Sequence, residues 1–94
     1  MTKRICITED SKTQARILEE ILVRSGYAVT VAENGMDGLY KITETRPDLI
    51  ISDVEMPQMN GYEFCRTVKT DKDLKGIPFI ILTLLSNVKD VVKG

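Results

Sequence analysis

The sequence predicts an α/β fold in which helices cover both faces of a parallel β-sheet. Short apolar clusters alternate along the 94 residues with segments whose apolar residues recur at helical spacing, which gives the order β-α-β-α-β-α-β-α. The apolar run within residues 48–53 is continuous, as expected for a parallel strand that is covered on both faces. This alternation implies right-handed crossovers and a three-layer, doubly wound α/β/α arrangement. No repeat, linker or low-complexity segment divides the sequence, so we expect one domain over residues 1–94.

The first part of the chain predicts two strands joined by a helix. Residues 4–8 form a short apolar cluster, and residues 27–32 are rich in Val. Between them, Ser11 is placed to begin a helix, with Gln14 in a capping-box relation to it, and Gly26 is placed to end it. The residues expected on the inner face of this helix are Ala15, Leu18, Ile21 and Leu22.

The middle of the chain predicts a second helix and a third strand. Asn34 follows the second strand and can cap a helix that runs to about Thr45. Pro47 ends this helix, and the third strand follows over residues 48–53. The residues expected to face inward from the helix are Met36, Leu39 and Ile42.

The last part of the chain predicts two further helices and a fourth strand. A helix over residues 62–69 places Phe64 and Val68 one turn apart. A fourth strand is expected over residues 79–83, and Ser86 can cap a last helix over residues 87–93.

Composition and charge argue against nucleic-acid and membrane partners. Lys and Arg total 13 against 14 Asp and Glu, and the basic residues are scattered, so no basic surface is predicted for nucleic acid. No stretch approaches the roughly 20 apolar residues of a membrane helix. The N-terminal apolar run, Ile5-Cys6-Ile7, is shorter than the roughly 7–15 residues of a signal-peptide core. We therefore expect a cytoplasmic protein.

The two cysteines fit that compartment. Spacing alone does not exclude a disulfide between Cys6 and Cys65, but neither residue lies in a CxxC or metal-binding pattern. We expect both to be reduced and buried as small hydrophobic residues.

Chemically reactive side chains follow the predicted strands at their carboxyl ends. The first strand leads into Glu9 and Asp10, the third ends at Asp53 with Glu55 two residues later, and the fourth ends at Thr83. Ligands of open α/β sheets bind at this edge, where the strand order reverses. If the first and third strands are neighbours, Glu9, Asp10 and Asp53 converge.

Such a cluster points to phosphoryl chemistry that depends on a metal ion. Close carboxylates repel, and a hard cation such as Mg²⁺, which prefers oxygen ligands, relieves the repulsion. A carboxylate can also act as a nucleophile and form an aspartyl phosphate, and the Thr83 hydroxyl could donate a hydrogen bond to a phosphoryl oxygen. Taken singly, these acids are more typical of turns or of a helix start, and Thr83 is typical of a strand end. Their occurrence together at one edge of the predicted sheet favours a functional site over these separate structural roles.

The same residues resemble a known family. Residues 48–61, including Pro57 and Gly61 in the loop after the third strand, resemble the signature around the phosphoacceptor of response-regulator receiver domains. The pair Glu9-Asp10 resembles the metal-binding acids of that family, and Thr83 resembles its switch Ser/Thr. The resemblance covers the chain in order and implies a flavodoxin-like sheet with strand order 2-1-3-4.

The resemblance also implies a role for each site residue. Asp53 would be the phosphoacceptor. Asp10 and Asp53 would bind Mg²⁺ directly, Glu9 would act through water, and the backbone carbonyl of Glu55 would complete the protein ligands. Thr83 would bind the phosphoryl group and shift on activation.

The sequence departs from the family pattern in two places. Leu84 stands where the family usually has a small residue, which predicts altered access of the phosphoryl group. The family's fifth strand, with its lysine, and its fifth helix are not present in these residues. From this we expect weakened phosphotransfer, and association into a homodimer or a domain swap through the open edge of the fourth strand.

The favoured function is a phosphoacceptor signalling switch rather than an enzyme that acts on a separate substrate. A histidine kinase or phosphotransfer protein, or a small phosphodonor, would phosphorylate Asp53, and an attached or partner output domain would respond. One alternative is a truncated scaffold fragment that no longer signals. Another is a small-molecule phosphatase, because Asp53-Val54-Glu55 resembles the Asp-x-Asp of haloacid-dehalogenase-like enzymes. That motif normally lies on the first strand, beneath a cap that is lacking here.

Overall fold

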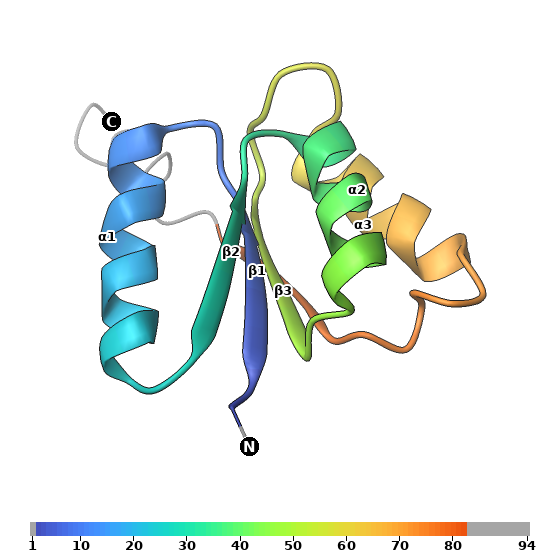
Figure 1. Cartoon of the computed structure of the whole chain (residues 1–94). Helices are drawn as coiled ribbons and strands as arrows, with labels where there is room; N and C mark the ends of the chain where they lie inside the picture. Colours follow the sequence, from blue (N-terminus) through green and yellow to red (C-terminus); the bar gives the residue numbers. More distant parts are fainter. Residues whose placement is uncertain (1, 83–94) are drawn as a thin grey trace.

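A computed structural model describes residues 2–82, which form one parallel sheet with helices on both faces (Figure 1). The sheet has four strands in the order β2-β1-β3-β4. Within residues 2–82, three helices alternate with the strands. The elements are β1 (Arg4–Thr8), α1 (Lys12–Arg24), β2 (Ala28–Ala32), α2 (Gly35–Thr45), β3 (Leu49–Asp53), α3 (Gly61–Thr70) and β4 (Phe79–Leu82).

The predicted fold class, element order and strand order are confirmed within these residues. The elements before β4 begin and end within two residues of their predicted bounds, and β4 begins at Phe79 as predicted. Gly26 has a φ of 98°, a conformation that favours glycine, and this explains why the chain turns there after α1. Thr83 and the helix predicted over residues 87–93 lie outside the described residues.

The strands pair in parallel, so their carboxyl ends meet at one edge of the sheet. Thr8 is the register partner of Ala32 on one side and of Ser52 on the other. β2 and β4 lie at the two sides of the sheet in residues 2–82. Association through the edge of β4 stays a prediction.

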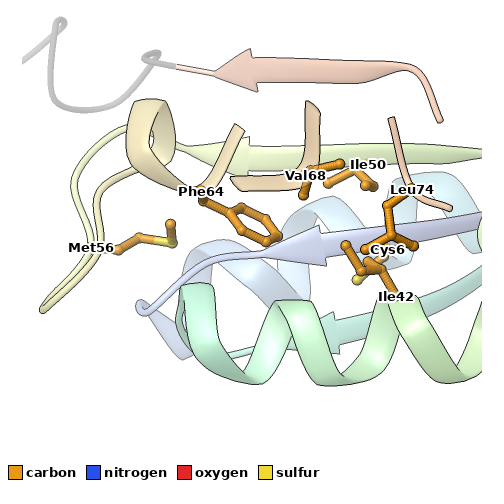
Figure 2. Close-up of a cluster of buried hydrophobic side chains, with 7 residues drawn as sticks. All are labelled: Cys6, Ile42, Ile50, Met56, Phe64, Val68 and Leu74. Atoms are coloured by element: carbon orange, nitrogen blue, oxygen red, sulfur yellow. The ribbon is translucent and has the colours of Figure 1, made fainter. Parts of the chain in front are cut away.

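The face covered by α2 and α3 carries the larger hydrophobic core (Figure 2). Phe64 is fully buried there, and its ring meets that of Phe79 edge to face, with the centroids 5.3 Å apart. Gly38 allows this packing, because a Cβ at that position would lie 2.8 Å from the Phe64 ring. The buried members of this core are Cys6, Ile42, Ile50, Met56, Phe64, Val68 and Leu74.

The opposite face, covered by α1, has a smaller core. Ile5, Ile7 and Ile51 are buried, and Leu18 and Leu22 pack against them from the helix. The prediction that Ile21 faces inward is wrong, since 56% of this residue is exposed. The inner stripe of α1 is narrower than its apolar content suggests, and it runs through Ala15, Leu18 and Leu22.

Two other predictions of burial are also wrong. Met36 was expected to face inward from α2, but it is 59% exposed. The inner face of α2 runs through Gly35, Gly38 and Ile42, all buried, so the adjacent position 36 points outward. Cys65 is only half-buried, whereas Cys6 is buried as expected, and both thiols are free.

None of the helices within residues 2–82 has the length and apolar character needed to span a membrane.

Candidate metal centre

The predicted acids converge at the carboxyl ends of β1 and β3. These two strands are direct neighbours, and Thr8 and Ser52 are register partners, so the chain continues past them into Glu9 and Asp53 at the same edge. An open cleft of about 550 Å³ lies above this edge. Its lining residues include Glu9, Asp10, Asp53, Glu55, Pro57 and Asn60.

Three carboxylates form the centre of the site. Glu9, Asp10 and Asp53 each offer an oxygen, and these three oxygens lie within 4.8 Å of one another. Asp10 is exposed, whereas Glu9 and Asp53 are half-buried. The structure therefore brings together the three acids that the sequence singled out. Glu55 is exposed and also lines the cleft, and Thr83 lies outside the described residues.

The backbone that follows Asp53 fixes the position of this residue. The Val54 N–H donates a hydrogen bond of 2.8 Å to Oδ1 of Asp53. The Ser52 hydroxyl donates a hydrogen bond of 2.9 Å to the Asp53 carbonyl oxygen. Gly61 folds back onto the same segment and donates from its N–H to the Val54 carbonyl at 2.7 Å. A Cβ on Gly61 would lie only 2.3 Å from the Asp53 carbonyl oxygen, so this close approach requires glycine.

Glu9 is held by the start of α1. The Ser11 N–H donates a hydrogen bond of 3.0 Å to Oε2 of Glu9. Ser11 is the N-cap, and its hydroxyl accepts from the Gln14 N–H at 3.3 Å, as the sequence predicted. The predicted capping box is only half right, because Glu9 rather than Gln14 accepts the N–H of the N-cap residue.

Burial and mutual repulsion shift the protonation of two of these acids. Burial raises the pKa of Glu9 to about 7, and the charges of Asp53 and Asp10 add to this effect, although the Ser11 N–H opposes it. Burial also raises the pKa of Asp53 above its ordinary value, and the charges of Asp10 and Glu55 act in the same direction. Without a bound cation, simultaneous ionisation of Glu9 and Asp53 is therefore unfavourable.

This arrangement fits a hard divalent cation. Carboxylate oxygens are the ligands that Mg²⁺ prefers, and a cation would relieve the repulsion that raises the two pKa values. The open cleft leaves room for water and for a further oxygen ligand beside the three acids. Among residues 2–82, no other group of three acidic, cysteine or histidine side chains is close enough to hold a metal ion.

Sequence reasoning missed a capping box that anchors α3 beside the site. The Asn60 side chain accepts from the Glu63 N–H at 2.9 Å, and the Asn60 N–H donates to the Glu63 carboxylate at 3.0 Å. This box fixes the helix start immediately after the loop that follows Asp53. The sequence carries the signal as Asn-x-x-Glu just before Phe64, with Gly61, a residue typical of loops, at the first helical position.

Comparison with known proteins gives one consistent family. The profile of the response regulator receiver domain family matches residues 5–94. Protein PilG of Pseudomonas aeruginosa is 35% identical over 91 residues, which are 97% of this chain and 67% of that protein. The DNA-binding response regulator MtrA of Mycobacterium tuberculosis is 34% identical over 94 residues, and the chain spans only 40% of its length.

A solved structure shares the fold at higher sequence identity. The signal receiver domain of a signal transduction histidine kinase from Syntrophus aciditrophicus is 49% identical and has a TM-score of 0.84. The match covers 97% of this chain and 69% of that one. The four parallel strands in the order β2-β1-β3-β4 thus form a sheet of the flavodoxin-like type.

Proposed function

Because the chain belongs to the response regulator receiver domain family, we propose that it acts as a phosphoacceptor switch in two-component signalling, with Asp53 as the acceptor. The observation that carries this proposal is the convergence of Glu9, Asp10 and Asp53, whose oxygens lie within 4.8 Å of one another. One carboxylate oxygen of Asp53 is held by the Val54 N–H, and the residue lies in an open cleft. It therefore combines a fixed orientation with access for a phosphodonor.

The proposed metal is Mg²⁺. Asp10 and Asp53 would hold the ion directly, Glu9 would hold it through water, and the Glu55 carbonyl would complete the set of protein ligands. When bound, Mg²⁺ would neutralise charge that develops on the phosphoryl oxygens during transfer.

The proposed reaction forms one bond and breaks another at phosphorus. A carboxylate oxygen of Asp53 attacks the phosphorus, and the bond from phosphorus to the donor nitrogen or oxygen breaks, with its electron pair leaving on the donor. A phosphohistidine donor regains a neutral imidazole by taking up a proton. The Thr83 hydroxyl would donate a hydrogen bond to a phosphoryl oxygen of the aspartyl phosphate. Water later hydrolyses this phosphate, so the domain acts on itself and not on a separate substrate.

The proposed partners follow from this chemistry. A histidine kinase or a phosphotransfer protein would supply the phosphoryl group in the cytoplasm, and an attached or separate output domain would respond. MtrA is named a DNA-binding response regulator, and the chain corresponds to 40% of its length. Any DNA binding would then belong to another domain, because these residues carry a net charge of −1 without a basic excess.

Intact-protein mass spectrometry tests the proposal. The protein is incubated with a small phosphodonor, with and without Mg²⁺, beside the Asp53→Asn variant. A gain of one phosphoryl group that requires both Asp53 and Mg²⁺ supports the switch. No gain, together with retained Mg²⁺ binding, favours the alternative of a scaffold fragment, whereas continuous turnover of a generic phosphate ester favours a phosphatase.

A further inference from the structure

The acid cluster raises the question of what keeps Glu9 in place before a cation binds. Its side chain has several rotatable bonds, and the neighbouring charges of Asp10 and Asp53 would drive it toward solvent. Glu9 nevertheless stays half-buried with a carboxylate oxygen in the cluster. A hydrogen bond between Glu9 and Asp10 requires that one of the two acids is protonated, so a contact that holds the ionised Glu9 carboxylate must come from elsewhere.

The structure supplies this contact at the first turn of α1. The Ser11 N–H donates to Oε2 of Glu9 at 3.0 Å, which places a hydrogen bond on a charged acceptor. The positive end of the α1 dipole lies at the same place and favours a negative charge there. This bond comes from the backbone and so does not depend on the side chain at position 11.

We propose that the Ser11 backbone N–H is a positioning group, which holds the Glu9 carboxylate in the acid cluster of the metal-free protein and thereby raises its affinity for Mg²⁺. The inference deepens the proposed function and rests on it for the identity of the cation. Ser11 itself would contact neither the cation nor the phosphoryl group, and would act through Glu9 alone.

A pair of substitutions at one position isolates the N–H. Ser11→Ala removes the hydroxyl that caps α1 but keeps the N–H, whereas Ser11→Pro removes both. The φ of −83° at Ser11 lies close to the value that proline requires, so position 11 itself accepts the ring. Proline also restricts the backbone of the preceding Asp10, so the effect of the N–H is the part of the difference between the two variants that disappears in a Glu9→Ala background.

The first measurement is calorimetric titration of the whole chain with Mg²⁺. Ser11→Pro is expected to bind about tenfold more weakly than Ser11→Ala, the lower end of the range for partners that orient a metal ligand. In a Glu9→Ala background the same two variants are expected to bind Mg²⁺ equally. Equal affinities in the presence of Glu9, or a difference that persists without Glu9, would overturn the proposal.

The second measurement does not require the proline variant to fold. In the metal-free protein, Glu9→Ala is expected to move the amide proton resonance of Ser11 upfield and to speed its exchange with solvent. Glu20→Ala removes one charge from the exposed side of the same helix and is the matched control, with no such change expected. An unaltered Ser11 amide in Glu9→Ala would overturn the proposal. Because no phosphodonor or cation is used, this result is separate from any failure of Asp53 to accept a phosphoryl group.

Discussion

The two acid-bearing strand ends deliver carboxylates to the same edge of the sheet, but they are built differently. At the end of β1 the chain passes through Glu9 and Asp10 directly into α1. The Glu9 N–H donates to the Ala32 carbonyl of β2, and the Ser11 N–H donates to the Glu9 side chain. At the end of β3, residues 54–60 separate Asp53 from α3, and Gly61 packs back against the Asp53 backbone.

The side chain at the end of β1 is therefore positioned by a local contact, whereas Asp53 at the end of β3 is positioned by packing against the start of α3. The side chain of Glu9 is held within a single turn of chain, so a change to this side chain should alter cation binding with little effect on the fold. Asp53 depends on a loop that also places Met56 in the larger core, so a change there should alter stability and chemistry together.

The largest expected effect is that of Gly61→Ala. The new Cβ would lie 2.3 Å from the Asp53 carbonyl oxygen, and backbone on both sides of the contact would have to shift. We expect the free energy of unfolding to fall by about 3 kcal/mol, the upper range for overpacking, and phosphorylation to slow. Denaturant unfolding measures the loss. Gly76→Ala is the control, because a Cβ there meets nothing within 4 Å; equal stability of the two variants would contradict the proposed role of Gly61.

A smaller effect, of opposite sign at the two strand ends, is expected from the buried hydroxyls behind the site. Thr8 and Ser52 are register partners and fully buried. The Ser52 hydroxyl donates to the Asp53 carbonyl, whereas Thr8 Oγ1 has no hydrogen-bond partner among the described residues apart from the Cys6 thiol, which is a weak acceptor. We expect Thr8→Val to stabilise the fold by about 1 kcal/mol and Ser52→Ala to destabilise it by about 1 kcal/mol. Denaturant unfolding of both variants measures these changes. If the two midpoints moved in the same direction relative to the wild-type protein, the predicted difference between the Thr8 and Ser52 hydroxyls would be wrong.

The smallest effect is a pH dependence at the end of β1. Because the pKa of Glu9 rises from 4.5 to about 7, the folded metal-free protein binds more protons than the unfolded chain in this window. The free energy of unfolding should therefore fall as the pH rises from about 4.5 to about 7. Glu9→Gln should make this slope shallower, with the remainder due to Asp53, whose pKa is also raised. Urea unfolding across the window measures both slopes, and identical slopes would count against the shift at Glu9.

The sequence was sufficient to predict the sheet and the three acids, because strand ends of a parallel sheet meet at one edge. Alternating apolar clusters located β1 and β3, and their acids then converged without knowledge of the loops. The side chains on the helices were harder to place. Met36 was wrongly placed inside, because Gly35 and Gly38 form the inner face of α2 through close backbone packing, which hydrophobic periodicity does not register.

The sequence pattern also could not predict which contacts the backbone groups make. The partner of the Ser11 N–H could be Gln14 or Glu9, and only the path of the chain at the end of β1 decides in favour of Glu9. In the same way, the pattern predicted that Gly61 lies in the loop after β3 but not that it contacts the Asp53 carbonyl.

The most direct test of the account compares Asp53→Asn with Asp10→Asn in a time course of phosphorylation by a small phosphodonor over a range of Mg²⁺ concentrations. If β3 carries the acceptor and β1 carries metal ligands, Asp53→Asn gains no phosphoryl group at any Mg²⁺ concentration. Asp10→Asn still gains one, more slowly and with a higher Mg²⁺ requirement. A phosphoryl group gained by Asp53→Asn, or an Asp10→Asn variant with the wild-type Mg²⁺ requirement, would contradict this division of roles.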